Sequence, residues 1–112
     1  MPVTAEHFRA LALACPDVVE GAHQGSADFR CAGRVFATIH ANGETGMVKL
    51  PPGEQARLVA AHDAFRPASG AWGRAGCTLV EFAAVTRAEL RDAVTAAWEF
   101  QLASAAHRRA KK

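Results

Sequence analysis

Apolar residues recur with helical spacing near the start of the chain. A threonine, Thr4, precedes this stretch and is a suitable N-cap, because its hydroxyl can accept a hydrogen bond from an amide of the first turn. Pro16 cannot continue a helix, so the pattern predicts a first helix that ends near Ala14. The apolar positions that share one face are Phe8, Leu11, Ala12 and Cys15.

Two later stretches also show helical patterns. The segment "PPGEQARLVAAHDAF", residues 51–65, has a modest apolar stripe and predicts a second helix. A third helix is predicted after Thr86, because Glu89 completes a capping box with it. This helix has a wide apolar stripe, whose members are Leu90, Ala93, Val94, Ala97, Trp98 and Leu102.

Between the helices the pattern changes to the alternation of β-strands. The stretch "DFRCAG" puts Phe29 and Cys31 on one face and Asp28 and Arg30 on the other, before a tight turn. A weaker strand is predicted in "VVEGAHQGSA", and a clear one in "CTLVEFA". The Gly- and Pro-rich stretch 66–76 between them is predicted to be a loop.

Residues 33–50, "GRVFATIHANGETGMVKL", predict a β-hairpin. Asn42 and Gly43 favour a two-residue type I′ turn, which pairs Ala37 with Val48. A longer loop of the same parity keeps the same faces together. The face expected in the core carries Val35, Ala37, Ile39, Val48 and Leu50. The mixed face carries Phe36, Thr38, His40, Thr45, Met47 and Lys49.

This order of elements predicts an α+β fold, in which helices pack on one face of an antiparallel sheet in a two-layer sandwich. With 112 residues the chain is long enough for a single core. We expect one domain over residues 1–106 and a basic, frayed tail over residues 107–112.

The net charge of +2 depends on that tail, which holds four of the thirteen Lys and Arg residues. Without them, nine basic residues face eleven acidic ones, whereas a domain that grips duplex DNA usually has a basic body. The remaining basic side chains concentrate between residues 30 and 74, where a one-sided basic face can form. The candidate phosphate contacts are Arg30, Arg34, Lys49 and Arg74.

Other candidate chemistry is sparse. The three cysteines show no C-x-x-C pair, which favours reduced thiols and a cytoplasmic protein. The five histidines are scattered, so no metal site and no cofactor are predicted. The sequence shows no nucleophile-elbow, Walker or dinucleotide motif and no apolar run long enough for a bilayer, so we expect neither an enzyme nor a membrane protein.

Four stretches together resemble the MmcQ/YjbR-like proteins, whose fold is similar to that of the frataxin/CyaY group. They are "LALACPDVVEG", "GSADFRCAGRVFATI", "MVKLP" and "ELRDAVTAAWEF". The resemblance implies a non-enzymatic, double-wing DNA-binding domain. It carries over Gly33, Arg34 and Lys49 as matching positions, whereas Arg30 and Arg74 are added on charge alone.

Two other functions stay open. The mixed strand face can serve as a protein-interaction surface, with an exposed apolar patch near Phe36, Met47 or Trp72. A small-molecule or metal-binding protein would gather His40, Trp72 or Cys77 in an enclosed pocket. Trp72 itself can stack on a base or a ligand, or cover the edge of the core. A monomer that binds DNA without sequence preference, in a salt-sensitive manner, is the leading hypothesis.

Overall fold

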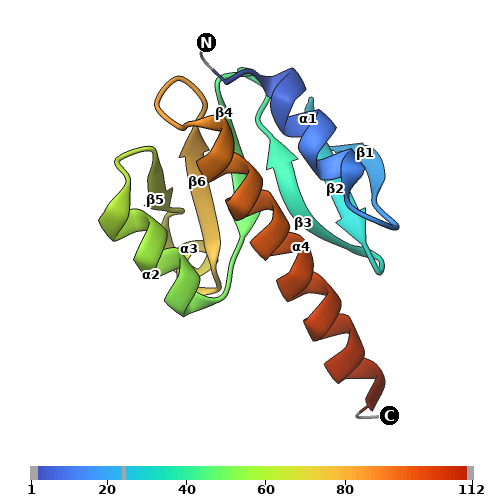
Figure 1. Ribbon diagram of the computed structural model, residues 1–112. Helices are drawn as coiled ribbons and strands as arrows, with labels where there is room; N and C mark the ends of the chain where they lie inside the picture. Colours follow the sequence, from blue (N-terminus) through green and yellow to red (C-terminus); the bar gives the residue numbers. More distant parts are fainter. Residues whose placement is uncertain (1–2, 24, 111–112) are drawn as a thin grey trace.

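The computed structural model describes residues 3–23 and 25–110, in which six strands form one antiparallel sheet. The strand order is β1-β2-β3-β4-β6-β5 (Figure 1). The strands are β1 (Val19–His23), β2 (Ser26–Cys31), β3 (Arg34–Ile39), β4 (Thr45–Lys49), β5 (Phe65–Pro67) and β6 (Cys77–Glu81).

Three of the helices cover one face of this sheet, namely α1 (Ala5–Ala14), α2 (Pro52–Ala61) and α4 (Arg87–Ala110) (Figure 1). The short helix α3 (Gly70–Arg74) lies on the other side. The α+β two-layer fold expected from the sequence is therefore confirmed. None of the helices in the described ranges combines the length and the apolar character needed to cross a bilayer.

Helices α1 and α4 begin at the caps that the sequence predicts. The Thr4 hydroxyl accepts a hydrogen bond from the His7 amide at 3.3 Å, and the Thr4 amide donates to His7 Nδ1. In α4 the Glu89 amide donates to the Thr86 hydroxyl at 3.1 Å, and the Thr86 amide donates to the Glu89 carboxylate at 2.9 Å. These reciprocal bonds satisfy amides that a helix start otherwise leaves unpaired.

The core between the layers is built on aromatic side chains. The Phe8 ring lies 6.0 Å from that of Phe29 and 5.5 Å from that of Phe82, centroid to centroid. On α4 the residues predicted to form the apolar stripe are buried from Leu90 to Ala97. The stripe then continues through Gln101 and Ala105 at a spacing of four, so Leu102, one residue past that line, is exposed.

The β3–β4 hairpin has the predicted register but a longer turn. Ala37 pairs with Val48, as expected. Gly43 has a positive φ of 70°, whereas Asn42 does not, so the turn is not type I′. Instead, the Asn42 side-chain oxygen accepts from the amides of Glu44 and Thr45, which closes a four-residue loop. A turn with positive φ at both central residues does occur at Ala32–Gly33, between β2 and β3.

A β-bulge in β3 changes which residues of this strand face the core, so the faces differ from those predicted. Arg30 pairs with Val35 and Phe29 pairs with Ala37, so Phe36 is an extra residue in β3. Phe36 and Ala37 are both fully buried, whereas Val35 turns to the open face of the sheet. The predictions that Val35 lies in the core and Phe36 on the mixed face are therefore wrong, because regular alternation breaks at the bulge.

Two further segments differ from the sequence prediction. The stretch 66–76, predicted to be a loop, forms most of β5 and all of α3. α2 ends at Ala61 because His62 is already extended, so Phe65 starts β5. α4 continues to Ala110, so residues 107–110, assigned to the tail, are helical; residues 111 and 112 lie outside the described residues.

Candidate functional site

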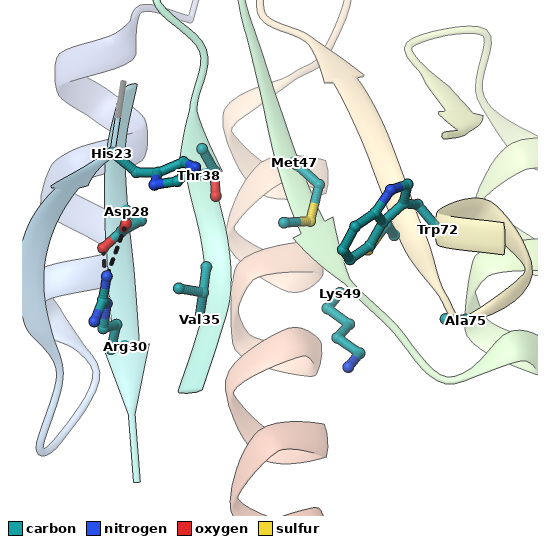
Figure 2. A pocket seen from close by; sticks show the side chains of 10 residues that line it. His23, Asp28, Arg30, Val35, Thr38, Met47, Lys49, Trp72 and Ala75 are labelled. Atoms are coloured by element: carbon teal, nitrogen blue, oxygen red, sulfur yellow. Dashed lines mark hydrogen bonds and ion pairs between the residues drawn. The ribbon is translucent and has the colours of Figure 1, made fainter. Parts of the chain in front are cut away.

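The open face of the sheet, opposite α1 and α4, contains a groove of about 420 Å³ (Figure 2). Its lining comes from five strands and from the α3 region, which rises over one side. The lining residues are His23, Asp28, Arg30, Val35, Thr38, Met47, Lys49, Trp72, Ala75 and Cys77.

Strand register explains why these residues meet. Alternation in β2 turns Asp28 and Arg30 to the open face, as the sequence predicts, while Phe29 enters the core. Across the sheet, Arg30 pairs with Val35. Thr38 pairs with Met47, and Lys49 pairs with Cys77, so side chains from four neighbouring strands share the same face.

Asp28 and Arg30 form a fixed pair at one side of the groove (Figure 2). The Asp28 carboxylate accepts from Arg30 Nε at 3.1 Å and from Nη2 at 3.3 Å. Hydrogen bonding and charge from Asp28 raise the pKa of Arg30. The Asp28 side chain is only 4% exposed and the Arg30 side chain is 48% exposed, so a buried anion orients a cation that solvent can reach.

Gly21 makes room for that carboxylate. It is the register partner of Asp28 on β1, and a Cβ at this position would lie 2.9 Å from Asp28 Oδ1. A side chain at residue 21 would therefore displace the carboxylate that holds Arg30.

The other candidate basic residues differ in position. Lys49 is half-buried in the groove lining and has no ion-pair partner among the described residues. Arg74 is exposed at the end of α3, outside the lining. Arg34 pairs with the core residue Cys31, so the pleat places it on the helix side of the sheet. The structure thus brings Arg30 and Lys49 together and separates Arg34 from them.

Two more basic residues of the 30–74 stretch are engaged with carboxylates. Arg57 pairs with Glu54 on α2, and Arg66 Nη1 lies 3.9 Å from the Glu81 carboxylate. The basic face predicted from composition is therefore smaller than the count of charges suggests.

Trp72 stands on α3 with 73% of its surface exposed, and its ring forms the wall of the groove facing Met47 (Figure 2). The backbone below it is firmly held. Gln55 Nε2 on α2 donates to the carbonyls of Gly73 and Cys77 at 3.0 and 3.1 Å and lies 3.1 Å from the Thr78 hydroxyl. Gly73 packs so tightly that a Cβ there would lie 1.9 Å from the Ala68 carbonyl oxygen. An exposed ring on an anchored backbone is suited to contact a ligand.

A second concavity of about 380 Å³ continues the groove past Trp72. It shares Thr38, Met47, Trp72 and Cys77 with the first. It adds His40, whose Nδ1 lies 2.7 Å from the Thr45 hydroxyl. Burial lowers the pKa of His40 and raises that of the Cys77 thiol, which favours the neutral form of both. The groups named for a small-molecule site thus lie together, on an open surface rather than in an enclosed pocket.

The apolar patch expected for a protein-interaction surface is reduced, because Phe36 is fully buried. Met47 is half-buried and Trp72 is exposed, so these two form its remainder. Within residues 3–23 and 25–110, no three His, Cys, Asp or Glu side chains are grouped so that they could hold a metal ion.

Several lining residues were not singled out from the sequence. Asp28 had a readable signal, because it is two residues from Arg30 in a strand and so shares its face. Val35 had none, since regular alternation assigns it to the core face and only the bulge turns it outward. His23 reaches the groove through its pairing with Ser26 across the β1–β2 turn.

The fold and the groove define an α+β two-layer protein, in which α1, α2 and α4 cover one face of the sheet and the groove lies on the opposite face beside the short helix α3. The sequence matches the YjbR family over residues 13–100, which is most of the chain, so the chain belongs to the YjbR family. This confirms the resemblance drawn from the four stretches. A comparison with curated proteins finds no match.

Proposed function

We propose that this chain is a non-enzymatic DNA-binding domain that contacts DNA through the open face of its sheet. One observation carries the proposal: the exposed ring of Trp72 and the cations of Lys49 and Arg30 line the same groove. Phosphates attract the cations, and bases stack on exposed aromatic rings. The three free cysteines suit the reducing cytoplasm, where we place this activity.

The charge distribution sets the strength and the salt dependence of this binding. Two cations line the groove, and the body of the chain, without the four basic residues of the tail, has two more acidic than basic residues. Because Asp28 pairs with one of these cations, we expect binding to neutralise one to two phosphates, which gives a slope of log K against log salt of about −1 to −2. We therefore expect weak, sequence-independent binding that is lost at moderate salt.

Fluorescence anisotropy with labelled DNA, titrated with protein over a range of salt concentrations, tests the proposal. Lys49→Glu removes a contact worth about 1.5 kcal/mol or more, so the affinity should fall at least roughly tenfold and the salt slope should become shallower. Arg91→Glu is the matched control, since it makes the same charge change on α4, where Arg91 lies beside Asp92. Equal losses in both variants would reject the open face as the binding surface.

The basic tail is the competing source of affinity for DNA. Replacing Arg108, Arg109, Lys111 and Lys112 with glutamine in the full chain removes its four charges. The open-face proposal expects most of the affinity, and the effect of Lys49→Glu, to persist in this variant. Binding that disappears with the tail charges would assign DNA contact to the tail.

A further inference from the structure

We propose that the groove holds one unstacked nucleotide, with its base against Trp72 and its phosphate at the Lys49–Arg30 end. This inference rests on the proposed function. The domain then binds single-stranded DNA in preference to duplex. This follows from the shape and the charge of the groove.

The exposed ring of Trp72 can stack only on a nucleic-acid base that is not already stacked between its neighbours. The Trp72 ring projects from α3 toward Met47, and the space between them is part of the groove (Figure 2). Within a duplex both faces of each base are covered by its neighbours, so a ring on the protein can stack only on a base that has left the helix. A volume of about 420 Å³ is in the range of sites for small organic molecules, about 300–1,000 Å³.

The charge at the other end of the groove fits one phosphodiester. Figure 2 shows Arg30 and Lys49 toward the same end, on either side of Val35. Arg30 uses Nε and Nη2 for Asp28, which leaves Nη1 to donate to a ligand. Because Asp28 balances the charge of Arg30, the lining without His23 has a net charge of about +1, which complements the single negative charge of a phosphodiester.

The rest of the face is not built for a duplex. A double helix presents two rows of phosphates and needs cations spread over a wide surface. Arg34, the basic residue nearest the β2–β3 turn, lies on the helix side of the sheet, and Arg66 is near Glu81. Among the candidate phosphate contacts, Arg30 and Lys49 lie in the groove and Arg74 is exposed at the nearby end of α3, which is too few cations for two rows of phosphates.

The test compares one labelled oligonucleotide as a single strand and as a duplex, at low salt, against four proteins. These are the wild type, Trp72→Ala, Trp72→Phe and the control Arg91→Gln. We expect the single strand to bind at least roughly tenfold more tightly than the duplex, and Trp72→Ala to weaken only the single strand, by roughly tenfold. Trp72→Phe keeps a flat ring and should retain most of the affinity. Trp72 is largely exposed, so Trp72→Ala should unfold at the wild-type urea concentration.

Tryptophan fluorescence provides a second readout. A base stacked on Trp72 should quench the wild-type emission, and the quenching should be absent in Trp72→Phe, which keeps only Trp98. Equal binding of both DNA forms, sensitive to Lys49→Glu but not to Trp72→Ala, would overturn this inference and leave the proposed function standing. No binding of either form by the wild type would overturn both.

Discussion

The two faces of one sheet have opposite roles in this molecule. The face toward α1 and α4 carries phenylalanine and aliphatic side chains that water does not reach, among them Phe29, Phe36 and Val48. The other face carries a paired aspartate and arginine, a lysine and an exposed tryptophan around a groove. A single bulge in β3 decides which residues of that strand belong to each face. The difference shows that a one-residue irregularity can set both the core and the candidate site.

The largest expected effect comes from truncating, one at a time, the two adjacent residues Val35 and Phe36 at the bulge. Phe36→Ala opens a cavity in the core and should lower the free energy of unfolding by about 3–5 kcal/mol. Val35→Ala, on the half-exposed open face, should lower it by less than about 1 kcal/mol. Urea unfolding of both variants measures the contrast. The opposite ranking would mean that β3 alternates regularly, without the bulge.

The support beneath Trp72 gives the next largest effect. Gln55→Ala removes the amide that bonds Gly73 and Cys77 and leaves their carbonyls without this donor. We expect a loss of about 1–3 kcal/mol in the free energy of unfolding, together with weaker single-strand binding because α3 is less firmly held. Gln55→Glu serves as a control that keeps the size of the side chain and removes the donor. A Gln55→Ala variant as stable as the wild type would show that α3 does not depend on α2.

Substitution of Arg34 tests whether this residue lies at the DNA interface, as the sequence suggested, or away from it, as the structure indicates. Its positive charge and its match to the resembled family made it a candidate phosphate contact, but its pairing with Cys31 places it on the helix side. Arg34→Glu should therefore change DNA affinity less than roughly twofold, whereas Lys49→Glu should lower it roughly tenfold. Anisotropy titrations at one low salt concentration are sufficient. Equal losses would return Arg34 to the interface and count against the pleat argument.

A smaller effect concerns pH and His40. Burial lowers the pKa of His40 below its ordinary value of 6.5, so the unfolded chain takes up a proton more readily than the folded one. The stability contributed by neutral His40 is present above about pH 6.5 and is lost as the pH falls through the folded pKa. His40→Gln should flatten the fall in unfolding free energy below that pH. An unchanged pH profile in urea unfolding experiments would show that His40 does not contribute.

Much of the fold is readable from local signals in the sequence. Thr4, Thr86 and Glu89 mark helix starts because capping needs only residues a turn apart. Alternation gave the faces of β2, and parity gave the Ala37–Val48 register even though the turn is longer than expected. These features depend on neighbours along the chain, so the chain alone reveals them.

The candidate site was less readable because distant contacts build it. The bulge at Phe36 has no signal in the alternation of β3, and α3 is held by Gln55, which lies 18 residues before Gly73 in the sequence. Lys49, Arg30 and Trp72, which the sequence offers as candidate contacts, all line the groove, whereas Arg34 does not. The missing information was the geometry between segments, which no local pattern contains.

The central claim is that the open face, and not the helix face, contacts DNA. Nuclear magnetic resonance of the isotope-labelled full chain, titrated with a single-stranded oligonucleotide, tests this most directly. The account predicts shifted signals at Arg30, at Lys49 and at the Trp72 indole N–H, with α1 and the first half of α4 unchanged. Shifts confined to the helix face or to the last turn of α4 would contradict it.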